Sequence, residues 1–193
     1  MKRYYIEISS GNKAKSDIDE ICNRNGFLNL TKRNYGNNGI GRFMTKVASV
    51  SNILFRLKKG DILLLQYPMK KFYKIACRFA HMKGAKVVTV IHDLGAFRRK
   101  RLNSVQENAR LSLTDFLIVH NSTMHKYLID NGYKGGVHDL GIFDYLSDKK
   151  MIEGRVPHKP WKVVYAGSMG YWRSGFLYKL DECSAKWDMD LYG

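Results

Sequence analysis

Short apolar runs alternate with segments of helical spacing along the first 147 residues, and no other feature limits the fold as strongly. The predicted strands are 4–8, 27–30, 62–65, 86–91, 115–119 and a short one near residue 137. The predicted helices are 16–25, 40–57, one that closes at Gly84, 100–113 and 122–131. Strands that alternate with helices and are themselves apolar are typical of a parallel sheet covered by helices. The pattern therefore predicts an α/β fold with a Rossmann-like parallel sheet domain over 1–147.

The character of the chain changes after residue 147. Residues 148–160 are charged, contain two prolines and lack periodicity, so we expect a linker there. A strand at 162–166, a loop at 167–175, a helix at 176–185 and a strand at 188–192 should follow. One β-α-β unit cannot bury both sides of a sheet. Residues 161–193 are therefore predicted to be the opening of a second Rossmann-like domain, begun and not finished.

Positive charge is concentrated in the larger part of the chain. The net charge is +16, from 33 Lys and Arg against 17 Asp and Glu in 193 residues. Residues 1–150 carry +15 of it, and the segment 21–92 has Asp61 as its one acid against fourteen Lys and Arg. Such a field attracts nucleic acid, an anionic membrane leaflet or a phosphorylated substrate, or it serves as a solvated basic face. No nucleic-acid module signature or aromatic platform is present, so we expect no nucleic-acid partner.

Cysteine usage and hydropathy indicate the compartment. Cys22, Cys77 and Cys183 lie far apart, and an odd count without C-x-x-C spacing argues against a disulfide framework or a zinc site. The N-terminus has no apolar signal region, and the aliphatic runs are too short to span a bilayer. We expect a cytoplasmic protein, either free or peripheral on the inner face of the membrane.

Polar residues follow several predicted strands at the point where each strand ends. They are Ser9-Ser10-Gly11, Gln66-Tyr67-Pro68, His92-Asp93 and His120-Asn121. In open parallel sheets, ligands bind at the carboxyl ends of the strands. His92 can hydrogen-bond a sugar or phosphate oxygen and Asp93 can act as a general base, or the pair can simply orient the next loop. Asn121 can contact a ligand or turn the chain before a helix capped by Ser122. The six histidines form no H-E-x-x-H metal pattern.

Six motifs in order connect this chain with a known family. They are Lys13-Ala14-Lys15-Ser16-Asp17-Ile18, Asp61-Ile62-Leu63-Leu64-Leu65-Gln66-Tyr67-Pro68, Val90-Ile91-His92-Asp93-Leu94, Val119-His120-Asn121-x-x-Met124, Gly141-Ile142-Phe143-Asp144-Tyr145-Leu146 and Val164-Tyr165-Ala166-Gly167. This set resembles bacterial sugar transferases of the two-Rossmann-domain (GT-B) type. The nearest groups are the β-1,6-galactofuranosyltransferases and the glucosyltransferase 3 of streptococcal adhesin glycosylation.

The resemblance implies a reaction and its partners. A nucleotide-sugar donor, usually a UDP-sugar, binds mainly to the C-terminal domain, and the N-terminal domain binds a lipid-linked or peptide-linked glycan acceptor. No metal or other cofactor is implied, because side chains and helix N-termini neutralise the diphosphate. Asp93 is the implied catalytic base of an inverting reaction, beside His92 at an interdomain cleft. The implied substrate-binding residues are Lys13, Ser16, Gln66, Tyr67, His120, Asn121, Gly167, Ser168 and Arg173.

Two departures from the family pattern affect the expectation. Members continue after Tyr-Ala-Gly with Asn-Leu and then Lys, whereas this chain has Ser168-Met169 and then Arg173. Family members also run on for a further hundred residues or so beyond the point that corresponds to Gly193. We therefore expect a truncated donor domain and little transferase activity from this chain alone. A non-catalytic basic module that binds an anionic membrane surface or glycan lipid is the alternative, and a homo-oligomer stays open.

Overall fold

The computed structural model describes residues 1–7, 13–31, 38–69, 72–96, 103–141, 146–147, 163–167, 169–182 and 189–192. Two compact units divide the chain, Met1–Ser147 and Asp148–Gly193. The expected linker at 148–160 lies outside the described residues.

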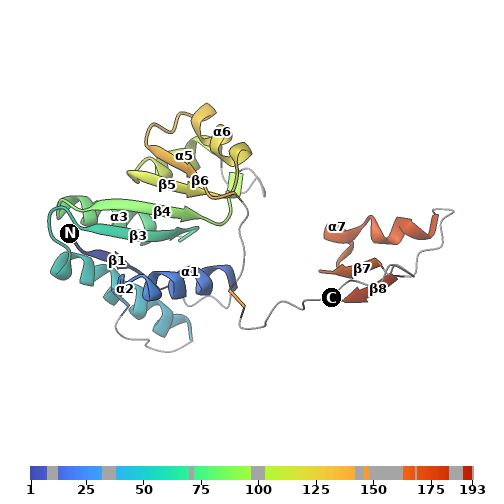
Figure 1. The fold of residues 1–193 in the computed structure, drawn as a ribbon, viewed down its shortest axis with the longest axis horizontal. Coiled ribbons are helices and arrows are strands. Elements are labelled where there is room, and N and C mark those ends of the chain that lie inside the picture. The colour runs from blue at the N-terminus through green and yellow to red at the C-terminus, as the bar shows by residue number, and fades with distance from the viewer. Residues whose placement is uncertain are drawn as a thin grey trace. The chain divides into compact units, whose positions relative to one another are not determined.

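The first unit is built on a six-stranded parallel sheet in the order β2-β1-β3-β4-β5-β6 (Figure 1). Its strands are β1 (Arg3–Tyr5), β2 (Leu28–Asn29), β3 (Ile62–Tyr67), β4 (Lys86–Ile91), β5 (Phe116–Val119) and β6 (Gly136–Asp139). The helices are α1 (Lys13–Arg24), α2 (Gly39–Arg56), α3 (Phe72–Met82), α5 (Ser104–Leu111) and α6 (Ser122–Asp130). The predicted α/β fold with a Rossmann-like parallel sheet is confirmed.

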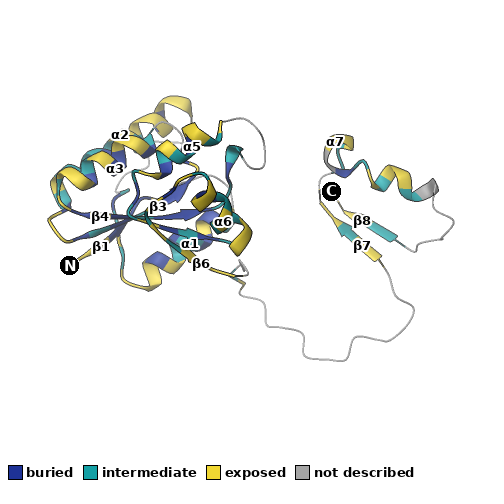
Figure 2. Cartoon of the chain, turned by 90° about the horizontal axis from the view of Figure 1, so that it is seen from above, coloured by how far each residue is buried: buried dark blue, intermediate teal, exposed yellow. Residues whose placement is uncertain are grey.

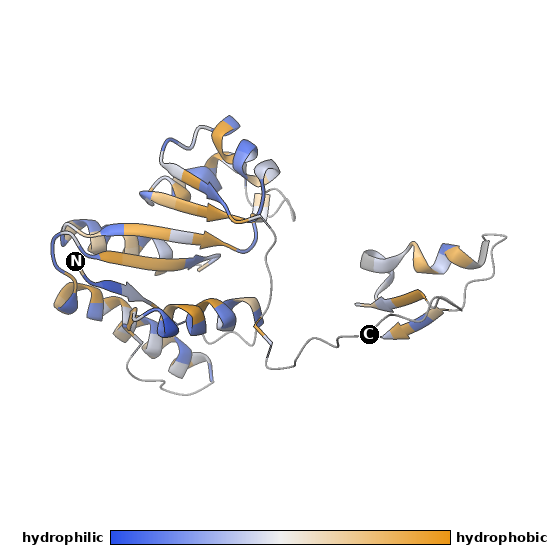
Figure 3. Cartoon of the chain, viewed as in Figure 1, coloured by the Kyte–Doolittle hydropathy of each residue, from blue (hydrophilic) through white to orange (hydrophobic). Residues whose placement is uncertain are grey.

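Strands β3 and β4 form the centre of the sheet. They pair in register from Ile62 opposite Lys86 to Tyr67 opposite Ile91. Both strands are largely apolar (Figure 3), and Leu63, Leu65 and Val87 are fully buried in the core. Burial on this scale is what fixes a parallel strand in place, since each apolar side chain gains about 1.5–3 kcal/mol when it leaves water.

The helix ends follow local rules, with two differences from expectation. Helix α1 begins at Lys13, so the prediction that Ser16 is its N-cap is wrong. The helix closes as expected at Gly26, whose φ of 72° lies in the left-handed region, and the Phe27 amide donates to the Cys22 carbonyl at 2.9 Å. Helix α2 ends at Arg56, one residue before the expected end, because Leu57 is already extended.

The order of the strands creates a switch point in the sheet. Helices α2, α3 and α5 cover one face, and α1 covers the other (Figure 2). The connection from β1 leads outward to β2, whereas the connections from β3 lead the other way to β4 and β5. The carboxyl ends of β1 and β3 therefore lie at the point where the chain reverses direction, which is where ligands bind in open α/β sheets.

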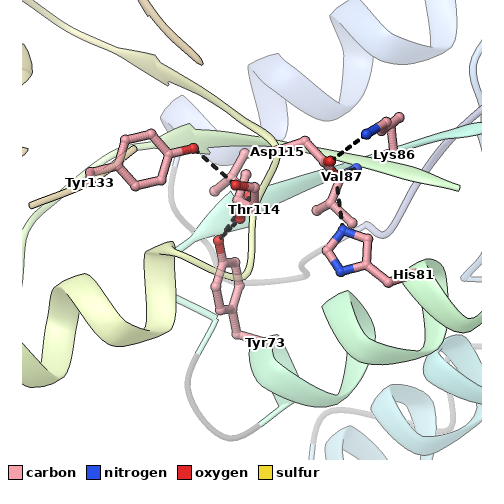
Figure 4. A network of polar contacts seen from close by, with 8 residues as sticks. Tyr73, His81, Lys86, Val87, Thr114, Asp115 and Tyr133 are labelled. Atoms are coloured by element: carbon pink, nitrogen blue, oxygen red, sulfur yellow. Dashed lines mark hydrogen bonds and ion pairs between the residues drawn. The ribbon is translucent and has the colours of Figure 1, made fainter. Parts of the chain in front are cut away.

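A polar network holds the opposite, amino-terminal edge of the sheet together (Figure 4). The Asp115 carboxylate accepts hydrogen bonds from the Val87 amide at 2.8 Å, the Lys86 ammonium at 2.9 Å and the His81 ring at 2.9 Å. These bonds lower the pKa of Asp115 to about 2, against the opposing effect of burial. The network joins the end of α3 to the starts of β4 and β5, and it is structural.

The second unit contains one pair of parallel strands, β7 (Val163–Ala166) and β8 (Met189–Tyr192). A short helix α7 (Tyr171–Ser174) lies in the segment expected to be a loop, and it ends at Gly175. The helix expected at 176–185 is instead a 3-10 helix over Leu177–Glu182, with 183–185 outside the described residues. Across the described part of the chain, no helix is both long enough and apolar enough to cross a bilayer.

Candidate functional site

Helix α1 turns charged side chains toward the switch point. Its buried residues include Lys15, Asp17 and Asp19, where an ordinary surface helix would bury apolar groups. Lys15 is 8% exposed and its ammonium donates to the Pro68 carbonyl, just past β3, at 3.0 Å. Buried charged groups are costly unless they are paired or hydrogen-bonded. Their concentration at this edge therefore identifies it as a polar site.

Gln66, near the end of β3, joins α1 to β4. Its side chain is 1% exposed. Its amide nitrogen donates to the Asp19 carboxylate at 2.6 Å and to the Lys15 carbonyl at 3.2 Å. Both of these partners only accept hydrogen bonds, so the amide orientation is set and the carbonyl oxygen must face the other way.

That orientation assigns the tautomer of His92. The ring Nε2 of His92 lies 2.7 Å from the Gln66 side-chain oxygen. Because this oxygen accepts, Nε2 carries the hydrogen, and in the neutral ring Nδ1 then bears the lone pair. The ring of His120, which follows β5, lies edge-on to it with centroids 6.5 Å apart. The carboxyl ends of β3, β4 and β5 thus contribute adjacent polar groups, as the sequence predicted for Gln66, His92 and His120.

Charge and burial keep His92 neutral. Burial, with the neighbouring Lys15 and His120, lowers the pKa of His92 to about 4. Burial also lowers the pKa of Lys15, helped by Lys46 of α2 and opposed by the Asp19 carboxylate. At neutral pH the His92 ring therefore carries no positive charge. It donates through Nε2 to Gln66, and its unprotonated Nδ1 is buried.

Asp93 lies half-buried directly after His92. The carboxylate of Glu107 holds the loop that contains Asp93. The buried Glu107 of α5 accepts the Gly95 amide at 2.8 Å and the Ala96 amide at 2.9 Å. The same carboxylate accepts the Tyr67 hydroxyl at 2.9 Å. Two backbone amides and the end of β3 thus converge on Glu107, and the loop that carries Asp93 is fixed relative to the sheet.

With this geometry established, the chain can be compared with known proteins. A family model described as the glucosyltransferase 3-like N-terminal domain matches residues 4–142. The chain belongs to this family. No curated protein matches it. The match to a glucosyltransferase 3-like domain makes this a chain of a glycosyltransferase family, and it includes all of the first unit's six strands except the first residue of β1.

The expected substrate-binding residues of this glucosyltransferase 3-like domain divide into exposed and buried ones. Lys13 and Ser16 lie on the exposed side of the first turn of α1. Lys13 also bonds Asp17 at 2.6 Å and the Leu146 carbonyl at 2.7 Å, which ties α1 to the end of the unit. Tyr67 is buried, its ring packs edge-on against Tyr73, and burial with Glu107 raises the pKa of its hydroxyl. Tyr67 therefore contributes to the core, and its role in substrate binding stays a prediction.

Two further residues serve as supports for their neighbours. Asn121 is the N-cap of α6, since its side-chain oxygen accepts a hydrogen bond from the Met124 amide at 2.9 Å. Ser122 is the first helical residue, so the prediction that Ser122 caps this helix is wrong. Gln66 is buried and positions His92, and its role in substrate binding stays a prediction. The expected residues at this edge that are exposed or half-buried are Lys13, Ser16, His92, Asp93, His120 and Asn121.

Three expected residues belong to the second unit. The Gly167 amide donates to the Tyr192 carbonyl at 2.8 Å, so Gly167 continues the β7–β8 pairing. Ser168 and the side chain of Arg173 lie outside the described residues. Within the described ranges, no group of three or more His, Cys, Asp or Glu side chains is arranged to hold a metal ion. The expectation that transfer proceeds without a metal stays a prediction.

Sequence reasoning missed Asp19 and Glu107. Asp19 stands one helical turn after Lys15, so the two share a face of α1, and this spacing was a usable signal. Glu107 had no such signal, because its partner Tyr67 is 40 residues away along the chain.

Proposed function

We propose that the first unit binds the sugar acceptor of a glycosyl transfer reaction at the carboxyl edge of its sheet, with Asp93 as the general base. The observation that carries the proposal is the hydrogen-bonded series Asp19–Gln66–His92, placed at the switch point of a glucosyltransferase 3-like domain. A series of this kind places polar groups in the interior, which is costly in free energy, and it holds one imidazole in one tautomer. A hydroxyl-bearing substrate is the natural partner for a base positioned beside such an imidazole.

The roles of the two adjacent side chains follow from charge. A proton added to His92 would create a buried cation with Lys15 close by, and the low pKa of His92, about 4, reflects mainly that burial. Asp93 becomes neutral when it accepts a proton, so it is the better base. His92 fixes the chain next to Asp93 through its bond to Gln66 and so positions the base for the acceptor.

The reaction balances as a displacement at the anomeric carbon. The acceptor hydroxyl gives its proton to Asp93 while its oxygen bonds to the anomeric carbon of the donor. The bond from that carbon to the diphosphate breaks, and the nucleoside diphosphate leaves with the electron pair. The acceptor oxygen attacks from the side opposite the leaving group, so the configuration inverts. General-base catalysis of this kind contributes roughly 10²–10⁴-fold to rate.

The donor and the setting are proposed from the resemblance of the motifs. The donor is a UDP-sugar bound by the second unit, with UDP-glucose and UDP-galactofuranose as the leading choices. The acceptor is a lipid-linked or peptide-linked glycan of cell-surface polysaccharide or glycoprotein synthesis, met on the cytoplasmic side of the membrane. Side chains and helix N-termini neutralise the diphosphate, so chelation with EDTA should leave transfer unchanged.

The test compares Asp93→Asn with a matched surface control. The purified chain is incubated with UDP-glucose or UDP-galactofuranose and an octyl β-glycoside acceptor, and the octyl disaccharide is measured by mass spectrometry. Asp93→Asn should lower transfer by about 100-fold or more while octyl glycoside binding persists. Asp130→Asn, an exposed carboxylate paired with Lys126 on α6, should leave transfer unchanged.

Two outcomes would contradict the proposal. One is full transfer by Asp93→Asn, which would show that Asp93 is not the base. The other is an intact chain that neither transfers sugar nor binds any octyl glycoside. Acceptor binding without transfer by the unsubstituted chain is the result expected of a truncated donor domain, whereas salt-sensitive binding to anionic vesicles without glycoside binding would favour the non-catalytic alternative.

A further inference from the structure

Helix α2 exposes an apolar stripe along its length. Ile40 and Phe55 are 78% and 84% exposed, and Phe43, Met44 and Val47 are exposed between them. These positions recur at intervals of three, four and eleven residues, so they lie on one side of the helix. The side that faces the sheet instead buries Gly41, Ser49, Val50 and Ile53. The outer stripe is therefore additional to the apolar face that the fold itself requires.

The stripe continues onto the neighbouring helix α3. The rings of Phe43 and Phe72 pack with centroids 5.8 Å apart. Ile75 and Met82 follow Phe72 at helical spacing, and both are exposed. We call this set the α2–α3 surface: Ile40, Phe43, Met44, Val47, Phe55, Phe72, Ile75 and Met82. Exposed side chains run along both helices on this face of the sheet (Figure 2).

Basic side chains accompany the α2–α3 surface, and acids are absent from it. Lys74 and Arg78 of α3 are exposed beside Ile75 and Met82, and neither α2 nor α3 contains Asp or Glu. The three basic residues of α2 lie instead on the sheet-facing side of that helix, where Arg56 donates to the Asn29 carbonyl. The nearest acid in sequence between the two helices, Asp61, is buried and accepts the Lys2 and Lys58 amides. The charge of this face is therefore uncompensated by carboxylates of its own helices.

We infer that the α2–α3 surface docks the first unit on an anionic lipid bilayer. A bilayer interface accepts apolar side chains while its anionic headgroups neutralise the adjacent Lys and Arg, and both terms favour binding. A second copy of the chain is the weaker occupant, because a two-fold interface would bring Lys74 and Arg78 near their equivalents with no carboxylate of α2 or α3 to pair with them.

The α2–α3 surface is separate from the switch-point site. Lys46, on the sheet-facing side of α2, lowers the pKa of Lys15, so that side of α2, and not the exposed stripe, lies near the site. The inference does not rest on the proposed reaction, since the chain can bind a bilayer whether or not it transfers sugar.

Vesicle sedimentation with the full chain tests the inference. The probes are vesicles of phosphatidylcholine alone and vesicles that also contain ~30% phosphatidylglycerol, each at low and at high salt. Binding should require phosphatidylglycerol and weaken with salt. Ile40→Ser with Phe55→Ser should weaken it by about tenfold or more. Lys74→Gln with Arg78→Gln should weaken it about 25-fold, from about fivefold for each cation.

Matched controls separate this surface from charge in general. Lys126→Gln with Lys134→Gln removes the same net charge from outside α2 and α3, and Ile21→Ser removes an exposed apolar group from α1 on the other face of the sheet. Both should bind as the unsubstituted chain does. The inference is overturned by absence of binding, by equal binding to phosphatidylcholine alone, or by equal loss in the lysine control. It is also overturned if the chain dimerises in solution and Ile40→Ser with Phe55→Ser abolishes the dimer.

Discussion

Replacing Gln66 by methionine removes the centre of the polar series while nearly conserving volume. Three hydrogen bonds are lost: to the Asp19 carboxylate at 2.6 Å, to the Lys15 carbonyl at 3.2 Å and from the His92 ring at 2.7 Å. A buried bond to a charged group contributes about 1.5–3 kcal/mol, and each neutral bond contributes about 1 kcal/mol. Methionine returns roughly 1 kcal/mol through apolar burial. The free energy of unfolding should therefore fall by about 3 kcal/mol.

Urea unfolding followed by circular dichroism measures this change. Gln106, on the exposed side of α5, is the other glutamine of the chain, and Gln106→Met should alter the free energy of unfolding by less than about 0.5 kcal/mol. Nitrogen-15 NMR of the histidine rings adds a readout that packing alone would not move. His92 should carry its hydrogen on Nε2 in the unsubstituted chain and lose that preference in Gln66→Met. A loss of stability below about 1 kcal/mol with an unchanged His92 tautomer would refute the reasoning.

Three further predictions concern pH and the loop after β4. Because the pKa of His92 falls to about 4 in the folded chain, the unfolded chain takes up the proton first, so stability should decline by about 2 kcal/mol as pH falls from 6.5 to 4. His92→Gln keeps a donor toward Gln66 and should lack that decline in urea titrations. Asp115, with its pKa lowered to about 2, should contribute roughly 1–2 kcal/mol near neutral pH that disappears between pH 4 and 2, and the stability gap between Asp115→Asn and the unsubstituted chain should close over that range. Glu107→Gln leaves one of two backbone amides without an acceptor and should speed hydrogen exchange at Gly95 and Ala96. Unchanged exchange there would contradict the role of Glu107.

Local pattern was sufficient for the sheet and for part of the site. Strand β4 spans the predicted residues because an apolar run is bounded by Gly84 on one side and a polar pair on the other. The rule that parallel strands end at one edge also brought Gln66, His92 and His120 together correctly. These features depend on the order of residues within a single element and on the direction of the strands.

Contacts set by strand order were beyond the reach of local pattern. Gln66 meets Asp19 across 47 residues, because β1 lies beside β3 and α1 packs against both. The start of α1 was misjudged for a different reason, since Ser16 is a good capping residue and the rule that favours it ignores tertiary contacts of Lys13 and Lys15. In the second unit, a short helix forms before Gly175 where a loop was expected, and the segment expected to be an α-helix forms a 3-10 helix.

The central claim is that the carboxyl edge of the sheet binds a sugar acceptor beside His92 and Asp93. Nitrogen-15 NMR of the histidine rings during titration with an octyl β-glycoside tests it most directly. The account predicts that the ring signals of His92, next to the base, shift when the acceptor binds, while those of His81 at the opposite edge, bonded to Asp115, do not move. Shifts confined to His81, or equal shifts at both rings, would contradict the account.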